Sequence, residues 1–124
     1  MKKLAFLFLS VSLGLATLVG CKQNSGPPPP LSADQIPVEL NRAFAKAPQI
    51  AKELATGVTS SLEKKDYAGA YQAVQVLIGV PDLTKEQQLI ATRAMLTITS
   101  LTQAAGAAGD KDAAAALQTL RNGR

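Results

Sequence analysis

The sequence has no histidine and no tryptophan, and Cys21 is its only cysteine. Without histidine, neither a Ser-His nor a Cys-His catalytic pair can be built, and the imidazole and paired thiolate ligands of a zinc site are missing. A single cysteine also excludes a disulfide within the chain. We therefore expect no catalytic residue, no metal site and no cofactor, and we do not expect an enzyme.

Aromatic residues are scarce as well, at 4% of the 124 residues, whereas 47% are hydrophobic and many of these are alanine. The core must then be built mainly from Leu, Ile, Val and Ala. This composition favours closely packed helices over a β-sandwich, which relies more on aromatic and β-branched residues. The length allows one small domain.

Basic residues are not clustered, although the formal net charge is +4. Beyond Lys2-Lys3 of the leader, the longest basic run is Lys64-Lys65, whereas nucleic-acid-binding proteins carry a basic stripe or patch. We therefore expect no nucleic-acid partner.

The N-terminus has the three-part plan of an export signal. Met1-Lys2-Lys3 is positively charged, Leu4 to Val19 is mostly apolar, and the small residue Gly20 precedes Cys21. The apolar run is short for a bilayer-spanning helix, which needs about 20 residues. Two other interpretations stay open, namely an uncleaved anchor over 4–21 and an ordinary secretory signal that is cut elsewhere.

Leu18-Val19-Gly20-Cys21 resembles the lipobox of bacterial lipoproteins. The resemblance implies that a diacylglyceryl group is attached to the Cys21 sulfur, that the leader is cut between Gly20 and Cys21, and that a further acyl chain such as palmitate is added in many bacteria. Two or more acyl chains, at about 0.8 kcal/mol per buried methylene, hold a protein stably at a membrane. Lys22 stands where aspartate would retain a Gram-negative lipoprotein at the inner membrane. In such a source we expect the periplasmic face of the outer membrane.

Residues 22–33, KQNSGPPPPLSA, have neither helical nor alternating periodicity. Their four consecutive prolines favour an extended polyproline II helix, which rises about 3.1 Å per residue. We interpret the segment as a semi-rigid spacer, with a docking motif for a proline-recognising partner as the alternative. The predicted division is a signal peptide over 1–20, a lipidated cysteine and tether over 21–33, and a helical domain over 34–124.

From Ser32 onward the apolar residues recur with a helical period. Ser32 and Gln35 form a capping box, and Pro48 ends a first short helix. A second helix is predicted from an apolar stripe at Ile50, Leu54, Val58 and Leu62, supported by Ala51 and Ala55. Gly57, in this second helix, is interpreted as a point of close helix crossing.

Each of the next three predicted helices begins at a capping residue. Asp66 caps the third, Thr84 with Gln87 the fourth, and Asp110 the fifth. The residues predicted to face the core are Tyr67, Ala70, Tyr71, Val74, Leu77 and Ile78 in the third helix, Ile90, Ala94, Ile98, Leu101 and Ala105 in the fourth, and Ala113, Leu117 and Leu120 in the fifth.

The fourth helix is predicted to be the central one, because Leu89 and Leu96 give it a second apolar face. Gly106 and Gly109 are expected to bracket the turn that follows it. The fold class is therefore an all-α bundle of about five antiparallel helices, arranged as a short N-terminal helix and two helical hairpins.

Two similar stretches begin the third and fifth predicted helices. They are KDYAGAY at 65–71 and GDKDAAA at 109–115, 44 residues apart, and each follows a longer helix. Asp66, Tyr67 and Ala70 match the D-Y-x-x-A pattern that is common in the second helix of a tetratricopeptide repeat, so the region 49–120 resembles that family. The spacing exceeds the usual 34 residues. The resemblance implies hairpins that bind other proteins.

The acidic residues have structural interpretations. Asp110 and Asp112, like Asp82 and Glu86, lie at predicted helix starts, where acidic side chains are expected to complement the helix dipole. The two tyrosines share one helical face, which indicates core packing.

Two functions from different classes stay open. The first is a lipid-anchored protein-interaction module with a partner in the cell envelope, which predicts an exposed apolar groove beside the third and fourth helices. The second is a structural or small apolar-ligand-binding lipoprotein without a dedicated protein partner, which predicts an enclosed cavity between helices. The alanine-rich last helix also permits self-association.

Overall fold

The computed structural model describes residues 28–123 apart from the side chain of Leu120, and this part of the chain is helical, with no strand. It forms five helices. They are α1 (Gln35–Ala43), α2 (Gln49–Glu63), α3 (Tyr67–Ile78), α4 (Lys85–Ala107) and α5 (Lys111–Asn122). The predicted all-α bundle is confirmed.

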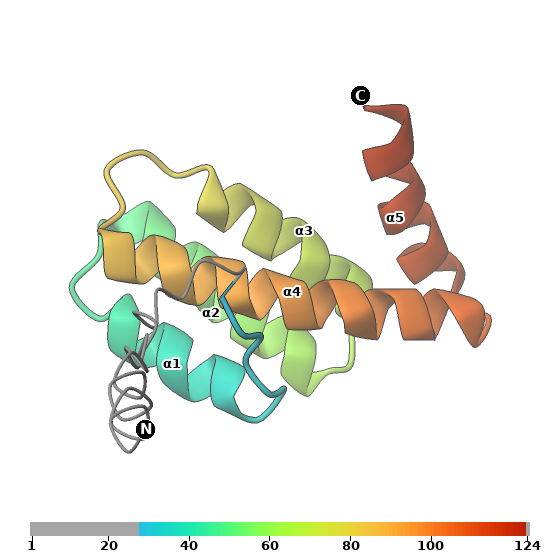
Figure 1. The fold of residues 1–124 in the computed structure, drawn as a ribbon, viewed down its shortest axis with the longest axis horizontal. Coiled ribbons are helices and arrows are strands. Elements are labelled where there is room, and N and C mark those ends of the chain that lie inside the picture. Colours follow the sequence, from blue (N-terminus) through green and yellow to red (C-terminus); the bar gives the residue numbers. More distant parts are fainter. Residues whose placement is uncertain (1–27, 124) are drawn as a thin grey trace, which may run out of the picture.

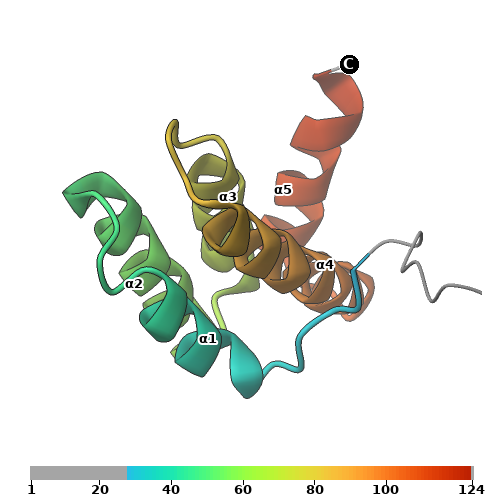
Figure 2. The same ribbon diagram turned by 60° about the vertical axis from the view of Figure 1, so that its left-hand side comes forward.

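The first four helices form a closed ring. α1 and α3 each contact both α2 and α4, whereas the diagonal pairs α1–α3 and α2–α4 do not meet. α5 contacts only α3 and α4, and it leaves the end of α4 at a steep angle (Figure 1; Figure 2). The molecule is thus a four-helix core with a fifth helix against one side.

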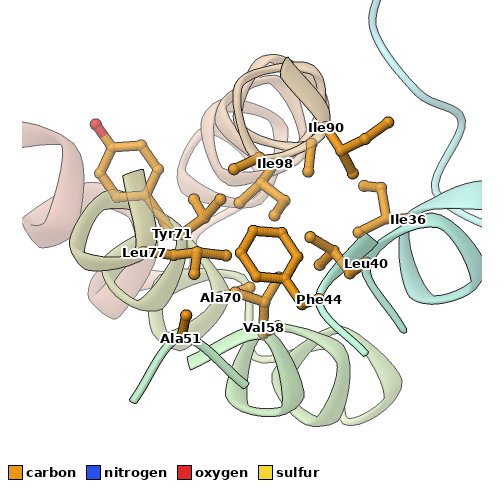
Figure 3. Packing of buried hydrophobic residues seen from close by; sticks show 14 of the residues in the cluster. Ile36, Leu40, Phe44, Ala51, Val58, Ala70, Tyr71, Leu77, Ile90 and Ile98 are labelled. Atoms are coloured by element: carbon orange, nitrogen blue, oxygen red, sulfur yellow. The ribbon is translucent and has the colours of Figure 1, made fainter. Parts of the chain in front are cut away.

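Phe44, directly after α1, lies in the middle of the buried cluster (Figure 3). Aliphatic side chains from all four ring helices surround it, and each is 3% exposed or less. They are Ile36, Leu40, Val58, Leu77, Ile90 and Ile98. Buried alanines occupy many of the other inward positions and let the helices approach closely. The core is therefore mainly aliphatic, as the composition predicts.

Both predicted aspartate caps form their hydrogen bonds. The Asp66 carboxylate accepts the Gly69 N–H at 2.9 Å. The Asp110 carboxylate accepts the N–H groups of Asp112 and Ala113 at 3.0 and 3.1 Å. These N–H groups would otherwise lack partners at the start of each helix.

Both predicted capping boxes also form. The Thr84 hydroxyl accepts the Gln87 N–H at 3.1 Å, and the Gln87 side chain accepts the Thr84 N–H at 3.0 Å. Ser32 and Gln35 make the same reciprocal pair at 3.3 and 3.2 Å, although regular helix begins only at Gln35. The start of α4 and the turn that leads into α1 are therefore encoded locally.

The α2–α3 and α4–α5 turns have the same backbone geometry. In each, the N–H of the capping aspartate donates to the carbonyl five residues earlier, at 2.8 Å for Asp66 and 3.0 Å for Asp110. The residue before the aspartate is left-handed, with φ of 57° at Lys65 and 105° at Gly109. Its N–H donates three residues back, at 3.0 and 3.2 Å respectively. Both turns are Schellman motifs that lead directly into a capped helix.

The predicted stripe of α2 is buried or partly buried except at its first residue, Ile50. Its other members are Ala51, Leu54, Ala55, Val58 and Leu62. Ile50 is 60% exposed, whereas Ala51, Ala55 and Val58 are all 3% exposed or less. Small side chains occupy the inward positions because α2 packs against both α1 and α3, and this turns Ile50 toward solvent. Gly57 is not at a close crossing, since a Cβ there would have no atom within 4 Å.

α4 has one buried face rather than the two predicted. Leu89 and Leu96 are 45% and 41% exposed, because α1, α3 and α5 leave that side of the helix uncovered. Gly106 lies inside α4 and not in the turn. A Cβ on Gly106 would lie 3.4 Å from the Ala114 backbone, so this glycine permits the close approach of α4 and α5.

Candidate functional site: the N-terminal segment on helix α4

Residues 28–31 lie along α4 before the chain enters α1 (Figure 1; Figure 2). Leu31 is only 3% exposed and belongs to the core cluster. The last part of the predicted tether over 21–33 is therefore packed against the helical domain, and the direction in which the chain leaves the domain is fixed.

Two α4 side chains, one helical turn apart, hold the carbonyl groups of this segment. The Arg93 guanidinium donates through Nε to the Pro29 carbonyl at 2.8 Å, and the Thr97 hydroxyl donates to the Leu31 carbonyl. The Leu31 N–H donates to the Arg93 carbonyl at 3.4 Å. Because proline has no N–H, a carbonyl is the only backbone group that Pro29 offers. The i, i+4 spacing of Arg93 and Thr97 places both donors on one side of the helix.

The packing of Leu31 was missed by the sequence analysis, although a local signal was present. Leu31 precedes the capping-box residue Ser32, and Ile36 follows Gln35. This is the arrangement of a hydrophobic staple, in which the residues that flank a capping box pack together. Leu31 and Ile36 are both buried in the same cluster.

An open groove of about 510 Å³ runs beside the segment. Its lining is mostly apolar and has no ionisable side chain. The lining residues are Pro28, Pro29, Pro30, Leu31, Leu96, Thr97 and Ser100. The groove lies beside α4, as predicted for an interaction module, but α3 contributes nothing to it. Such a surface can bind apolar groups, but its lining offers no acid or base.

A smaller hollow of about 140 Å³ lies between α1 and α2, where Lys52 is the only ionisable residue among those that line it. Leu40 and Phe44 lie at its base, and both are buried. This hollow is also open to solvent, so it does not have the enclosed form predicted for a small-ligand carrier.

The two tyrosines have different environments. Tyr71 is 1% exposed, which confirms its predicted place in the core, whereas Tyr67 is half-buried. The Tyr71 hydroxyl has no hydrogen-bond partner among the described residues. Figure 3 shows its ring directed away from the group around Phe44. Burial raises the pKa of Tyr71 above its ordinary value.

One exposed ion network joins α1 to the start of α4. Arg42 contacts Glu39 at 2.7 Å and Glu86 at 2.7 Å. The hydrogen bond to Glu39, followed by that to Glu86, raises the pKa of Arg42 above its ordinary value. Glu86 also lies in the first turn of α4, as predicted. These side chains connect two helices and do not form a reactive site.

The predicted lipid-attachment residue Cys21 and the rest of the lipobox, Leu18, Val19 and Gly20, lie outside the described residues. Among residues 28–123, no helix has the length and apolar character needed to cross a membrane. No group of three His, Cys, Asp or Glu side chains in that range could hold a metal ion. Comparison with protein-family models, curated proteins and solved structures finds no match to this chain.

Proposed function

We propose that this protein is a bacterial lipoprotein whose lipidated Cys21 anchors a helical protein-interaction module at a membrane of the cell envelope. The observation that carries the proposal is the sequence Leu18-Val19-Gly20-Cys21 at the end of a charged and then apolar leader. No residue downstream competes for the thiol, since the chain has no second cysteine and no histidine.

The geometry of the described residues is compatible with such an anchor. The chain enters the domain through residues 28–31, which Arg93, Thr97 and the buried Leu31 hold against α4. Only six residues separate Cys21 from Pro28. A lipid on Cys21 would therefore keep the whole domain close to the membrane.

The interaction role is supported by the two equivalent hairpin turns. Lys65-Asp66 and Gly109-Asp110 make the same hydrogen bonds at equivalent positions of α2–α3 and α4–α5. Paired hairpins of this kind present extended helical surfaces, which is how tandem-hairpin proteins bind partners. The match of Asp66, Tyr67 and Ala70 to a tetratricopeptide pattern belongs to the same proposal.

Membrane fractionation of cells that express the full chain tests the anchor. The wild-type protein is expected in the membrane fraction, and Cys21→Ala in the soluble fraction or as an uncleaved precursor. Cys21→Ala with the same amount of protein in the same membrane fraction and in processed form would contradict the proposal. Where the source has two membranes, Lys22→Asp should move the protein from the outer to the inner membrane.

Cross-linking of the full lipidated chain in intact envelopes tests the interaction role. A tagged wild-type protein should recover one reproducible partner in stoichiometric amount. The matched Cys21→Ala variant has the same domain without the anchor and should recover much less of it. Failure of the wild-type protein to recover any reproducible partner would count against an interaction module.

A further inference from the structure

We propose that the uncovered side of α4, together with the adjoining proline segment, rests on the lipid surface in which Cys21 is anchored. This inference rests on the proposed function, because it requires the lipid on Cys21. We call this surface the anchor face. It consists of Lys85, Leu89, Arg93, Leu96 and Ser100 of α4 with Pro28, Pro29 and Pro30.

The anchor face combines exposed apolar side chains from two distant parts of the chain. Leu89 and Leu96 are 45% and 41% exposed, and their i, i+7 spacing places them on the same side of α4. The groove beside Leu96 continues the apolar surface onto residues 28–30. Isolated exposed leucines are ordinary, but here Leu96 lines the same groove as the segment that leads to the anchor.

The charge on this face suits anionic lipid headgroups. Lys85 and Arg93 are basic, and the remainder of α4 after Glu86 has no acidic residue. Glu86 precedes this stretch and is bound to Arg42 at 2.7 Å. Arg42 also binds Glu39, so this exposed network at the start of α4 keeps a net charge of −1. Helices that lie at a membrane interface combine leucines with flanking Lys or Arg in this way.

The length of the intervening chain keeps this face near the membrane. The seven peptide steps from Cys21 to Pro28 span at most about 25 Å, whereas the 23 residues of α4 extend over about 34 Å. Because Arg93 holds Pro29 against α4, the chain leaves the domain on the anchor face. The tether thus gives this face a high effective concentration at the bilayer, so a weak contact is enough to orient the domain.

Site-specific labelling of the full lipidated protein tests the orientation. Because the lipid blocks Cys21, a newly introduced cysteine is the only free thiol in the chain. Leu96→Cys and Leu89→Cys place a polarity-sensitive fluorophore on the anchor face. Val76→Cys and Ile50→Cys are the matched controls, because these side chains are 57% and 60% exposed on α3 and α2.

Each labelled protein is reconstituted into vesicles of phosphatidylethanolamine and phosphatidylglycerol that contain a lipid-borne quencher. We expect quenching at positions 89 and 96 to exceed that at 50 and 76 by on the order of twofold or more. Equal quenching at all four positions, or stronger quenching at the controls, overturns the inference. The inference is also overturned if the label at position 96 is not quenched by the lipid but becomes shielded when an envelope extract is added, because a protein would then cover this face.

Co-flotation with the vesicles separates the two proposals. If the wild-type protein does not float with the vesicles, the proposed lipid anchor is wrong and the orientation fails with it. If the protein floats but quenching is uniform, the anchor stands and only the orientation is wrong.

Discussion

Lys65 occupies a backbone conformation that glycine adopts more easily. Its φ of 57° lies in the left-handed region, and Gly109 holds the equivalent position in the α4–α5 turn. A side chain in this region costs about 1–2 kcal/mol, whereas the greater freedom of glycine in the unfolded chain costs about 0.5–1 kcal/mol. The α2–α3 turn is therefore formed at some cost in stability.

We predict that Lys65→Gly raises the free energy of unfolding by up to about 1 kcal/mol. Lys65→Ala removes the charge but keeps the Cβ atom, and it should leave stability nearly unchanged. Urea denaturation of both variants is the measurement. A Lys65→Gly variant that is less stable than Lys65→Ala would contradict this account, because the greater freedom of glycine in the unfolded chain would then outweigh the backbone strain that a Cβ atom causes here.

Gly57 and Gly69 should respond in opposite ways to alanine. A Cβ at Gly57 has no atom within 4 Å, so Gly57→Ala should stabilise the helix by about 0.5–1 kcal/mol. A Cβ at Gly69 would collide with the carboxylate of Asp66, which caps α3. Loss of that cap should cost about 0.5–2 kcal/mol. Thermal unfolding of the two variants would contradict this account if both moved in the same direction.

The buried hydroxyl of Tyr71 predicts a pH effect. Burial raises the pKa of Tyr71 in the folded protein, so the unfolded chain loses the phenol proton first as the pH rises through about 10. Stability therefore falls above that pH. In Tyr71→Phe this fall in stability should be shallower. Stability at pH 7 should rise by about 1 kcal/mol, because the hydroxyl has no partner among the described residues.

Urea titrations at pH 7 and pH 10.5 are the measurement, with Tyr67→Phe as the control. A Tyr71→Phe protein that loses as much stability between these pH values as the wild type would contradict the account.

Among the helices, the start of α4 connects to the end of α1 through one buried amide. Gln87 is 7% exposed, and its Nε2 donates to the Ala43 carbonyl at 3.2 Å while its Oε1 accepts the Thr84 N–H. The same side chain thus caps the beginning of one helix and the end of another. The exposed Arg42–Glu86 pair lies at the same junction.

Gln87→Glu should separate these two roles. The carboxylate can still accept the Thr84 N–H, but it has no donor for the Ala43 carbonyl and adds a buried charge. We expect a loss of about 1–3 kcal/mol at pH 7. Gln88→Glu, which adds the same charge at an exposed position, should change stability by less than about 0.5 kcal/mol. Equal losses in the two variants by urea denaturation would show that the bond to Ala43 contributes little.

Helix existence could be predicted from the sequence because its signals are local. Asp66, Thr84 and Asp110 each bond to N–H groups two or three residues away, so their caps do not depend on the rest of the fold. The rotation of each helix about its own axis could be predicted less accurately than its existence. Ile50 and Ala51 compete for the same inward position, and only the packing of α2 between its neighbours decides between them.

For the whole molecule, the sequence can indicate only the part of the candidate site whose residues are consecutive. The proposed lipobox consists of four consecutive residues and stays a prediction, because it lies outside the described residues. The docking of the proline segment depends on contacts between Pro29 and Arg93 and between Leu31 and Thr97, which are 64 and 66 residues apart in the sequence. No periodicity connects such distant positions. The staple pattern at Leu31 and Ile36 is the local signal for the burial of Leu31 that the sequence-based interpretation as a spacer missed.

The intact mass of the protein extracted from membranes tests the lipid anchor most directly. The account predicts a chain that begins at Cys21 and carries the added mass of a diacylglyceryl group, with or without a further acyl chain, and no free thiol. A chain that retains residues 1–20, or that begins elsewhere with an unmodified thiol at Cys21, would contradict it.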